Sequence, residues 1–181
     1  DVSLTLENME DTDTTTTEPI YWKILLDEID FENVGFALNM PQDSLFVRTM
    51  LPQTTLKDGV IDLKEASYYV KSFDMDNAEL AYGPKEELSL KKIGLQLDSI
   101  YYCGRDIRAN IEEFVFKERS GLELVSTEGR IASDSVLIQI PKFTMKTTAS
   151  SLDLQTKIGW DVLEMKKTGV LSAKINAEIG K

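Results

Sequence analysis

The sequence predicts an all-β protein, an elongated antiparallel sheet that curls around one apolar face. The main observation is that apolar residues recur at every second position in segment after segment, as in Trp22, Ile24 and Leu26. Such alternation buries one face of a strand and leaves the other in water, which is typical of antiparallel sheets. A tight-turn dipeptide, Asp58-Gly59, and a weak internal repeat support the same fold class.

Period-two alternation defines about thirteen strands along the chain. The alternating segments include residues 22–26, 34–40, 88–90, 93–97, 114–116, 122–124, 138–140, 143–145, 152–158 and 171–177. One segment differs: from Trp160 to Lys167 the apolar residues fall at helical spacing, which predicts one or two helical turns. The predicted protein is therefore strand and turn almost throughout.

The dipeptide Asp58-Gly59 predicts a two-residue hairpin turn, which would pair Leu56 with Ile61. Further from this turn, the apolar alternation changes phase on both predicted strands, near Pro52 and near Lys64-Glu65. A bend or a pair of bulges crossing the hairpin would cause such a change. A sheet bent in this way would form a trough.

The internal repeat relates residues 54–82 to residues 124–152, at a shift of about 70 residues. The shift places Phe73 on Phe143, and a break in alternation just before Phe73 recurs just before Phe143. Repeated units that cannot bury their own apolar face are expected to stack into an elongated array.

Three segments are expected from the composition. Residues 1–6 read as the end strand of a preceding unit, and residues 7–19 as a flexible acidic, Thr-rich loop or linker. Residues 20–181 read as a single β-rich domain. Because both ends of the chain lie within strand patterns, we expect an excerpt of a longer polypeptide.

The composition argues against several functions. The formal net charge of −11 disfavours nucleic acid as a partner. The chain has no His and one Cys, Cys103, which excludes His-dependent triads, His-ligated metals and internal disulfides. Asp74 and Asp76 fit a solvated strand face better than a cation site, and Ser120-Gly121 fits a turn better than a nucleophile elbow. With 31 acidic residues, a carboxylate pair for glycoside hydrolysis would arise by chance, so none is singled out. We expect no enzyme, no metal and no cofactor.

One region resembles a known family. It has the pattern Phe-Lys-Glu-x-Ser-Gly-Leu at residues 116–122, then Gly129, then Thr-x-x-Ser-x-Leu at residues 147–152 (a second spacing through Thr148 and Ser151 also fits). This region is similar to TamB/AsmA-type envelope proteins of Gram-negative bacteria, in their Bacteroidetes-like form. The resemblance extends over roughly residues 20–181 and rests on degenerate strand patterns.

The resemblance implies a taco-like or grooved sheet from the periplasmic body of a translocation and assembly module. Such proteins are anchored in the inner membrane by an N-terminal helix, which this chain does not include. They are expected to carry phospholipid between membranes, or to assist outer-membrane biogenesis with a barrel assembly partner that binds regions outside this chain.

Alternation and resemblance together predict a lipid groove that binds phospholipid acyl chains, with no catalytic residue. The predicted lining is Trp22, Ile24, Leu26, Phe36, Leu38, Val70, Phe73, Met75, Leu95, Phe116, Leu124, Ile138, Ile140, Phe143, Met145 and Leu152. The alternative is an extracellular β-sandwich that serves as a binding or adhesion module, with a filled core and a surface aromatic platform.

Overall fold

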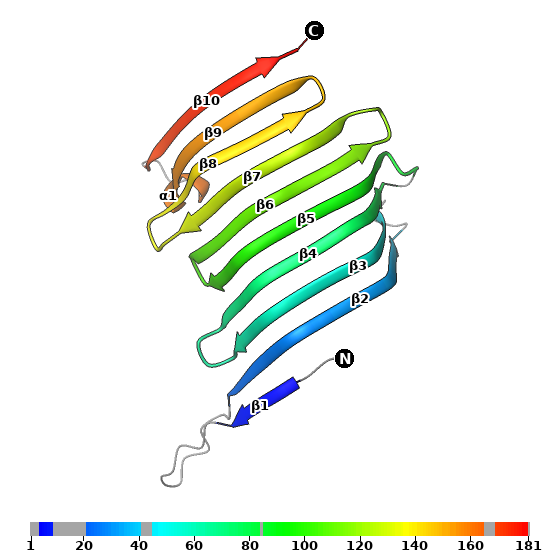
Figure 1. The fold of residues 1–181 in the computed structure, drawn as a ribbon. Coiled ribbons are helices and arrows are strands. Elements are labelled where there is room, and N and C mark those ends of the chain that lie inside the picture. Colours follow the sequence, from blue (N-terminus) through cyan, green and yellow to red (C-terminus); the bar gives the residue numbers. More distant parts are fainter. Residues whose placement is uncertain (1–3, 9–20, 41–44, 84, 165–168, 181) are drawn as a thin grey trace.

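The computed structural model describes residues 4–8, 21–40, 45–83, 85–164 and 169–180. These residues form one open antiparallel sheet of ten strands, in which each strand lies beside its neighbours in sequence (Figure 1). The elements are β1 (Leu4–Asn8), β2 (Trp22–Met40), β3 (Leu45–Asp62), β4 (Ser67–Tyr82), β5 (Leu88–Cys103), β6 (Asp106–Glu118), β7 (Glu123–Ser133), β8 (Leu137–Thr147), β9 (Ser150–Gly159), α1 (Trp160–Leu163) and β10 (Leu171–Ile179).

The prediction of an all-β antiparallel protein is confirmed, whereas the predicted count of about thirteen strands is wrong. The described residues form ten strands, because several of them are much longer than expected. The predicted strands 22–26 and 34–40 are two parts of β2, and 88–90 and 93–97 are two parts of β5. The breaks in alternation that suggested strand ends are bends inside continuous strands.

The prediction of a hairpin turn at Asp58-Gly59 is also wrong. β3 runs through both residues and pairs with β2 on one side and β4 on the other. The chain turns later, where Asp62 Oδ1 accepts hydrogen bonds from the backbone N–H groups of Lys64 (3.0 Å) and Glu65 (3.1 Å). Leu56 consequently pairs with Phe73 rather than with Ile61.

Packing within the sheet explains the Asp-Gly sequence. A Cβ on Gly59 would lie 3.2 Å from Leu26 Cβ and 3.2 Å from Leu56 Cδ2, so a glycine allows these side chains to pack closely. Asp58 has φ 50°, a left-handed conformation that Asp tolerates better than most residues. The dipeptide therefore bends the strand without reversing it.

The predictions for the Ser120-Gly121 turn, the helix at Trp160 and the linker 7–19 had different outcomes. The Ser120-Gly121 turn is confirmed, with Gly121 at φ 102°. A short helix does begin at Trp160, although it is assigned only to Leu163. Most of the predicted linker 7–19 lies outside the described residues, and Leu4–Asn8 pairs with β2 as part of the same sheet.

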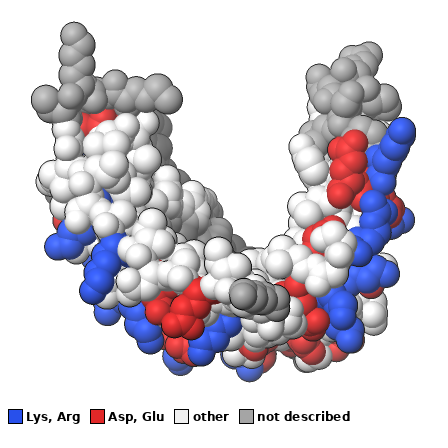
Figure 2. Space-filling view, turned by 90° about the horizontal axis from the view of Figure 1, so that it is seen from above, with Lys and Arg blue, Asp and Glu red and all other residues white. Residues whose placement is uncertain are grey.

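Bends cross the sheet and give it a U-shaped cross-section (Figure 2). β8 contains a bulge: two residues separate Ile140 from Phe143, while one residue separates their β9 partners Thr156 and Leu154. This is the predicted break in alternation before Phe143, and it is confirmed. The predicted break near Lys64-Glu65 is wrong, because these residues lie in the turn after β3.

The sheet is a single layer. Among the described residues, the buried hydrophobic side chains are Ala78, Ala81, Ile93 and Leu124. The described part of the chain contains no helix long and apolar enough to cross a lipid bilayer. The usual second layer, which would cover the apolar side of such a sheet, is not found within these residues.

Candidate functional site

The candidate site is one continuous face of the sheet, which we call the apolar face. Directly paired residues of antiparallel strands project to the same side of a sheet. In the central section, Phe73 pairs with Leu56 of β3 and with Leu97 of β5. One step along the strands, Met75 pairs with Thr54 and Leu95. These rows are apolar from strand to strand.

The bulges keep the apolar side chains on this face when the strands bend. At the β8 bulge, Ile140 and Phe143 oppose Thr156 and Leu154, which are two residues apart in β9 and therefore share a face. The extra residue places both Pro141 and Lys142 on the other side. Two residues also separate Met75 from Ala78 in β4, against one residue in β5.

In β3, two consecutive residues, Lys57 and Asp58, also project to the charged side. Both residues interact with charges of the opposite face, since Lys57 pairs with Glu28 at 2.8 Å and Asp58 with Lys71 at 2.7 Å. The residues on either side, Leu56 and Gly59, point to the apolar face. The phase of alternation therefore changes without moving an apolar side chain across the sheet.

The strand registers bring all sixteen predicted groove residues onto the apolar face. Phe36 and Leu38 continue it beyond the central section through their partners Thr49 and Val47. At the other end, Tyr68 pairs with Tyr102, and their ring centroids are 5.9 Å apart.

Sequence reasoning missed several members of this face. They are Ile29, Phe31, Leu56, Tyr68, Leu97, Ile100, Tyr102, Ile111, Phe114, Ile131, Leu154 and Ile158. Some, such as Ile29 and Phe31, are out of phase with the alternation of the preceding segment because a bend intervenes. A signal was present, since two consecutive polar residues interrupt the alternation at several of the bends, as at Asp27-Glu28.

Many large side chains of the apolar face remain exposed. The exposed fraction is 41% for Trp22, 41% for Phe31 and 56% for Phe36. Most of the others, including Phe73 and Phe143, are partly buried by neighbours in the same face. A monomer in water rarely leaves a contiguous apolar surface of this extent uncovered, so such surfaces usually mark binding sites.

Two hydroxyl groups on this face are buried without a partner. Thr54 and Thr127 are 2% and 1% exposed, and their Oγ1 atoms make no hydrogen bond. Thr54 lies opposite Met75, and Thr127 lies opposite Met145. Thr156, which is also buried, differs because its Oγ1 donates to the carbonyl oxygen of Ser172 at 2.9 Å.

The opposite face carries charge. It includes ion pairs between Lys57 and Glu28 and between Lys71 and Asp58. The hydrogen bond and negative charge of Glu28 raise the pKa of Lys57, and Asp58 raises the pKa of Lys71 in the same way. Figure 2 shows Lys, Arg, Asp and Glu gathered mainly along the outer side of the U.

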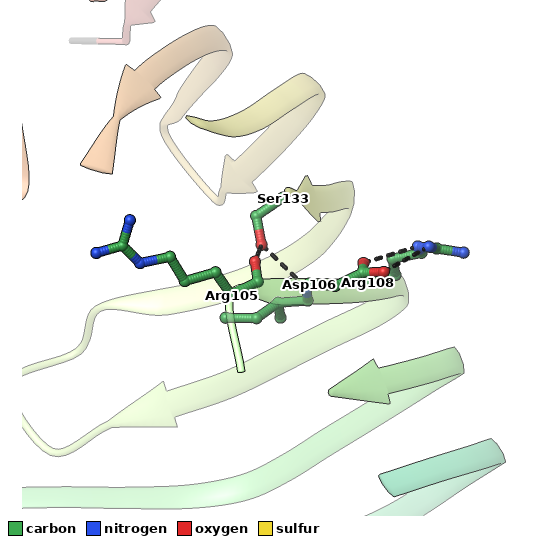
Figure 3. A network of polar contacts seen from close by, with 5 residues as sticks. Arg105, Asp106, Arg108 and Ser133 are labelled. Atoms are coloured by element: carbon green, nitrogen blue, oxygen red, sulfur yellow. Dashed lines mark hydrogen bonds and ion pairs between the residues drawn. The ribbon is translucent and has the colours of Figure 1, made fainter. Parts of the chain in front are cut away.

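A polar network holds one end of the strands together (Figure 3). Ser133 Oγ donates to the carbonyl oxygen of Arg105 at 2.6 Å and accepts from the backbone N–H of Ile107 at 3.0 Å. Arg108 binds both carboxylate oxygens of Asp106, at 3.0 and 2.7 Å. In Figure 3 the Arg105 side chain points away from this pair.

The Arg105 side chain extends toward α1. It forms an ion pair with Glu164, and its guanidinium carbon lies 5.5 Å from the ring centroid of Trp160. Trp160 Nε1 in turn donates to the carbonyl oxygen of Asp134 at 2.7 Å. These contacts tie three turns of the sheet together, which is a structural role rather than a reaction centre.

Among the described residues, no group of three or more His, Cys, Asp or Glu side chains is placed to hold a metal ion. Asp74 and Asp76 are exposed on the charged face, opposite Thr55 and Gln53. Comparisons with protein-family models, with curated proteins and with solved structures find no match to this chain. The apolar face is therefore the feature from which a function has to be argued.

Proposed function

We propose that this chain is a section of an envelope scaffold that holds lipid acyl chains in an apolar trough, without catalysis. The observation that carries the proposal is the apolar face, which continues from β2 to β10 and has no covering layer among the described residues. Acyl chains are chemically suited to it, since each buried CH₂ group contributes about 0.8 kcal/mol.

We infer that the apolar face lines the hollow of the U. The β8 bulge adds length on the charged side, where Pro141 and Lys142 both project, and a sheet bends away from its longer side. The concentration of charged side chains along the outer side in Figure 2 agrees with this orientation. In this arrangement, lipid chains occupy the hollow and water contacts the charged face.

The trough favours binding of lipid acyl chains over binding of lipid headgroups. Its central rows hold Ile29, Leu56, Phe73, Leu97 and Ile111, with no ionisable side chain among them. A phosphate inside the hollow would lose hydration without gaining an ion-pair partner, which is unfavourable. Headgroups are therefore expected at the open side of the U.

Ten strands about 4.8 Å apart span roughly 43 Å, about the thickness of one bilayer. A trough of this length could shelter lipid, but further length would be needed to connect two membranes. This agrees with the resemblance to long periplasmic proteins. Location in the periplasm, an inner-membrane anchor outside this chain, and an outer-membrane barrel assembly partner belong to the proposal on that resemblance alone.

The alternative, a β-sandwich adhesion module, needs two packed sheets around a filled core. The described residues form one open sheet with four buried hydrophobic side chains. This arrangement favours the trough, and a folded protein without bound lipid in the following test would favour the sandwich-type module.

The test is native mass spectrometry with lipid extraction on the 181-residue protein, purified without detergent from cells with a phospholipid envelope. The matched variants are Phe143→Lys, on the apolar face, and Thr144→Lys, on the charged face opposite Glu128 and Asp153. We expect near-stoichiometric phospholipid in the parent and in Thr144→Lys, and about tenfold less in Phe143→Lys.

A folding control accompanies this test, because a Lys at position 143 could unfold the sheet. Phe36→Lys introduces the same charge at an apolar-face position that is already 56% exposed, and circular dichroism reports whether the strands persist. If the folded parent protein carries no lipid, or if Phe143→Lys and Thr144→Lys retain lipid equally, the proposal is wrong.

A further inference from the structure

The charged face contains a recess of about 540 Å³ that crosses β2, β3, β4 and β5, and we call it the outer pocket. Two rows of directly paired residues, which project to the charged face, form its sides. One row contains Gly35, Met50 and Glu79, and the other contains Ala37, Arg48, Ala81 and Ser89. Its volume lies within the range of sites that bind small molecules.

The pocket is hollow because several of these side chains are small. Gly35 has no side chain, and Ala81 is 6% exposed. Larger groups stand at the sides, where Arg48 meets Glu86 from the turn between β4 and β5. Arg48 Nη2 and Glu86 Oε1 lie 2.6 Å apart and form an ion pair. The charged face therefore has an enclosed place of its own, separate from the trough.

One polar group in the outer pocket is buried without a partner. Ser89 is 8% exposed, and its hydroxyl makes no hydrogen bond within the part of the chain that the structure describes. A buried hydroxyl without a partner lowers stability. Thr54 and Thr127 share this property but lie opposite Met side chains on the apolar face. Ser89 differs because it lines a recess that a hydrogen-bonding ligand can enter.

The charges beside the outer pocket are not balanced. A bulge in β5 sets two consecutive lysines, Lys91 and Lys92, against Glu79 alone in β4. Among the described residues, none of these three forms an ion pair. Arg48 is balanced by Glu86, so two unpaired lysines remain against one unpaired carboxylate. The surroundings of the pocket are thus positive in a chain whose net charge is −11.

Lys91 also faces a like charge on its other side. It pairs directly with Lys117 of β6, and like charges on directly paired residues destabilise a strand pair. Lys117 lies 3.4 Å from a carboxylate oxygen of Glu123, whereas Lys91 has no such partner among the described residues. An anion bound beside Lys91 would offset this repulsion.

We propose that the outer pocket binds the phosphate group of a small organic molecule or of a lipid headgroup. Lys91 and Arg48 supply positive charge, and the Ser89 hydroxyl donates a hydrogen bond to a phosphate oxygen. Arg48 can take part because its bond to Glu86 uses Nη2, and the guanidinium has further N–H donors. A phosphate presents several acceptor oxygens, which suits donors from two different strands.

The proposal does not depend on lipid in the trough, because the outer pocket lies on the other face of the sheet. The shared chemistry is a phosphate, which either a free phosphate ester or a membrane phospholipid can supply. Two probes therefore test it: glycerol phosphate in solution, and vesicles of phosphatidylglycerol mixed with phosphatidylcholine.

The first test is an NMR titration of the isotope-labelled 181-residue protein with glycerol phosphate. It is done at about 0.15 M salt, where attraction is screened beyond about 8 Å. We expect saturable shifts of the backbone amide signals of Ser89 and Lys91. Lys91→Gln should weaken binding about tenfold, as expected for the loss of one charge-assisted contact.

The matched control is Lys142→Gln, which should leave binding unchanged. Lys142 lies on the charged face and is directly paired with a cation, Arg130, but it does not line the outer pocket. The two variants therefore change the net charge equally and differ in position. The absence of saturable shifts in the parent protein, or equal binding by the two variants, would overturn the proposal.

Ser89→Ala tests the hydroxyl separately from the charge. Without ligand this hydroxyl has no partner, so its removal should leave the thermal unfolding temperature unchanged or higher. Binding of glycerol phosphate should nevertheless weaken by about fivefold. Unchanged binding in Ser89→Ala would show that the hydroxyl does not contact the phosphate, contrary to the proposal.

Vesicle flotation with the same variants identifies the source of the phosphate. If Lys91→Gln reduces flotation with the vesicles and Lys142→Gln does not, the pocket takes a lipid headgroup. If the two variants float equally while glycerol phosphate still distinguishes them, the ligand is a free phosphate ester. Vesicle binding through the trough affects both variants alike, so it does not alter this comparison.

Discussion

The β3–β4 and β7–β8 hairpins solve the same structural problem in different ways. In both, an Asp at the turn accepts two backbone hydrogen bonds: Asp62 does so in the first hairpin, and Asp134 Oδ1 does so in the second, from Val136 (2.7 Å) and Leu137 (3.0 Å). In both, a buried Thr lies opposite a Met on the apolar face.

The two hairpins differ in the way their strands bend and in the residue that lies opposite Phe73 or Phe143. In β4 the step from Val70 to Phe73 is matched residue for residue by both neighbouring strands, whereas the β8 step from Ile140 to Phe143 contains a bulge. Phe73 faces Leu56, but Phe143 faces Gly129. The two hairpins thus place apolar side chains on the same face, although one uses a matched bend and the other a bulge. This is expected if the fold depends on a continuous apolar face. Whether the hairpins are a true sequence repeat remains a prediction.

The largest expected effect comes from shortening each bend by one residue. Deletion of Lys71 leaves two residues in β3 and two in β5 opposite one in β4, so each ladder loses about one hydrogen bond of about 1 kcal/mol. Deletion of Pro141 instead removes the extra residue of β8 at this bulge, so that β8 matches β7 and β9 there. We expect a loss of about 2 kcal/mol for the first and less than about 1 kcal/mol for the second, measured by urea unfolding.

The same two deletions should differ in their effect on the curvature of the sheet. Loss of the β8 bulge should flatten the sheet, which small-angle X-ray scattering would detect as an increased radius of gyration. If deletion of Pro141 costs more stability than deletion of Lys71, the distinction between a matched bend and a bulge is wrong.

The next effect concerns the two Phe residues. Phe143 covers Gly129, since a Cβ there would lie 2.7 Å from Phe143 Cδ2. An aromatic ring over a glycine shields the strand at a point with no side chain of its own. Phe143→Ala should therefore destabilise the protein by about 1 kcal/mol more than Phe73→Ala, whose neighbours Leu56 and Leu97 can close over the gap. Equal losses in thermal unfolding would contradict this role of the ring.

A smaller effect is expected from the buried Thr residues. Thr54→Val and Thr127→Val each replace an unpaired buried hydroxyl with a methyl group, so each should stabilise the protein by about 1 kcal/mol. The matched control is Thr156→Val, which loses a hydrogen bond to Ser172 and should destabilise by about 1 kcal/mol. Chemical denaturation measures the change in stability of all three variants. If all three changes have the same sign, hydrogen bonding of the Thr hydroxyl does not determine the effect.

The smallest effect is at the second turn. The backbone N–H groups of Leu137 and Val136 hold the pKa of Asp134 below its ordinary value of 3.8. Because the folded pKa is the lower one, the stabilisation is complete above pH 3.8 and is lost as the pH falls through the folded pKa. Asp134→Asn keeps an acceptor oxygen but cannot titrate.

We therefore expect Asp134→Asn to match the parent protein at pH 7 and to lose less stability on acidification. Thermal unfolding between pH 7 and pH 3 tests this difference. If the two proteins lose stability in parallel, the carboxylate of Asp134 does not contribute to the acid sensitivity.

Alternation in the sequence grouped apolar side chains that the strand registers place on one side of the sheet, whereas the prediction of where the chain turns was wrong. Trp22, Phe73 and Phe143 were assigned to one face because period-two alternation reports the environment of each side chain directly. Asp58-Gly59 was misread because a turn and a bend both interrupt the alternation and favour the same residues.

Local residue patterns are sufficient to predict the all-β class and the separation of apolar from charged side chains along each strand, since both are properties of neighbouring residues. The length of the strands, the turn at Asp62 rather than at Asp58 and the single open layer of the described sheet could be seen only in the assembled fold. These features depend on which strands lie on either side. β3 continues through Asp58 because both β2 and β4 pair with it beyond that point, and local sequence carries no record of these partners.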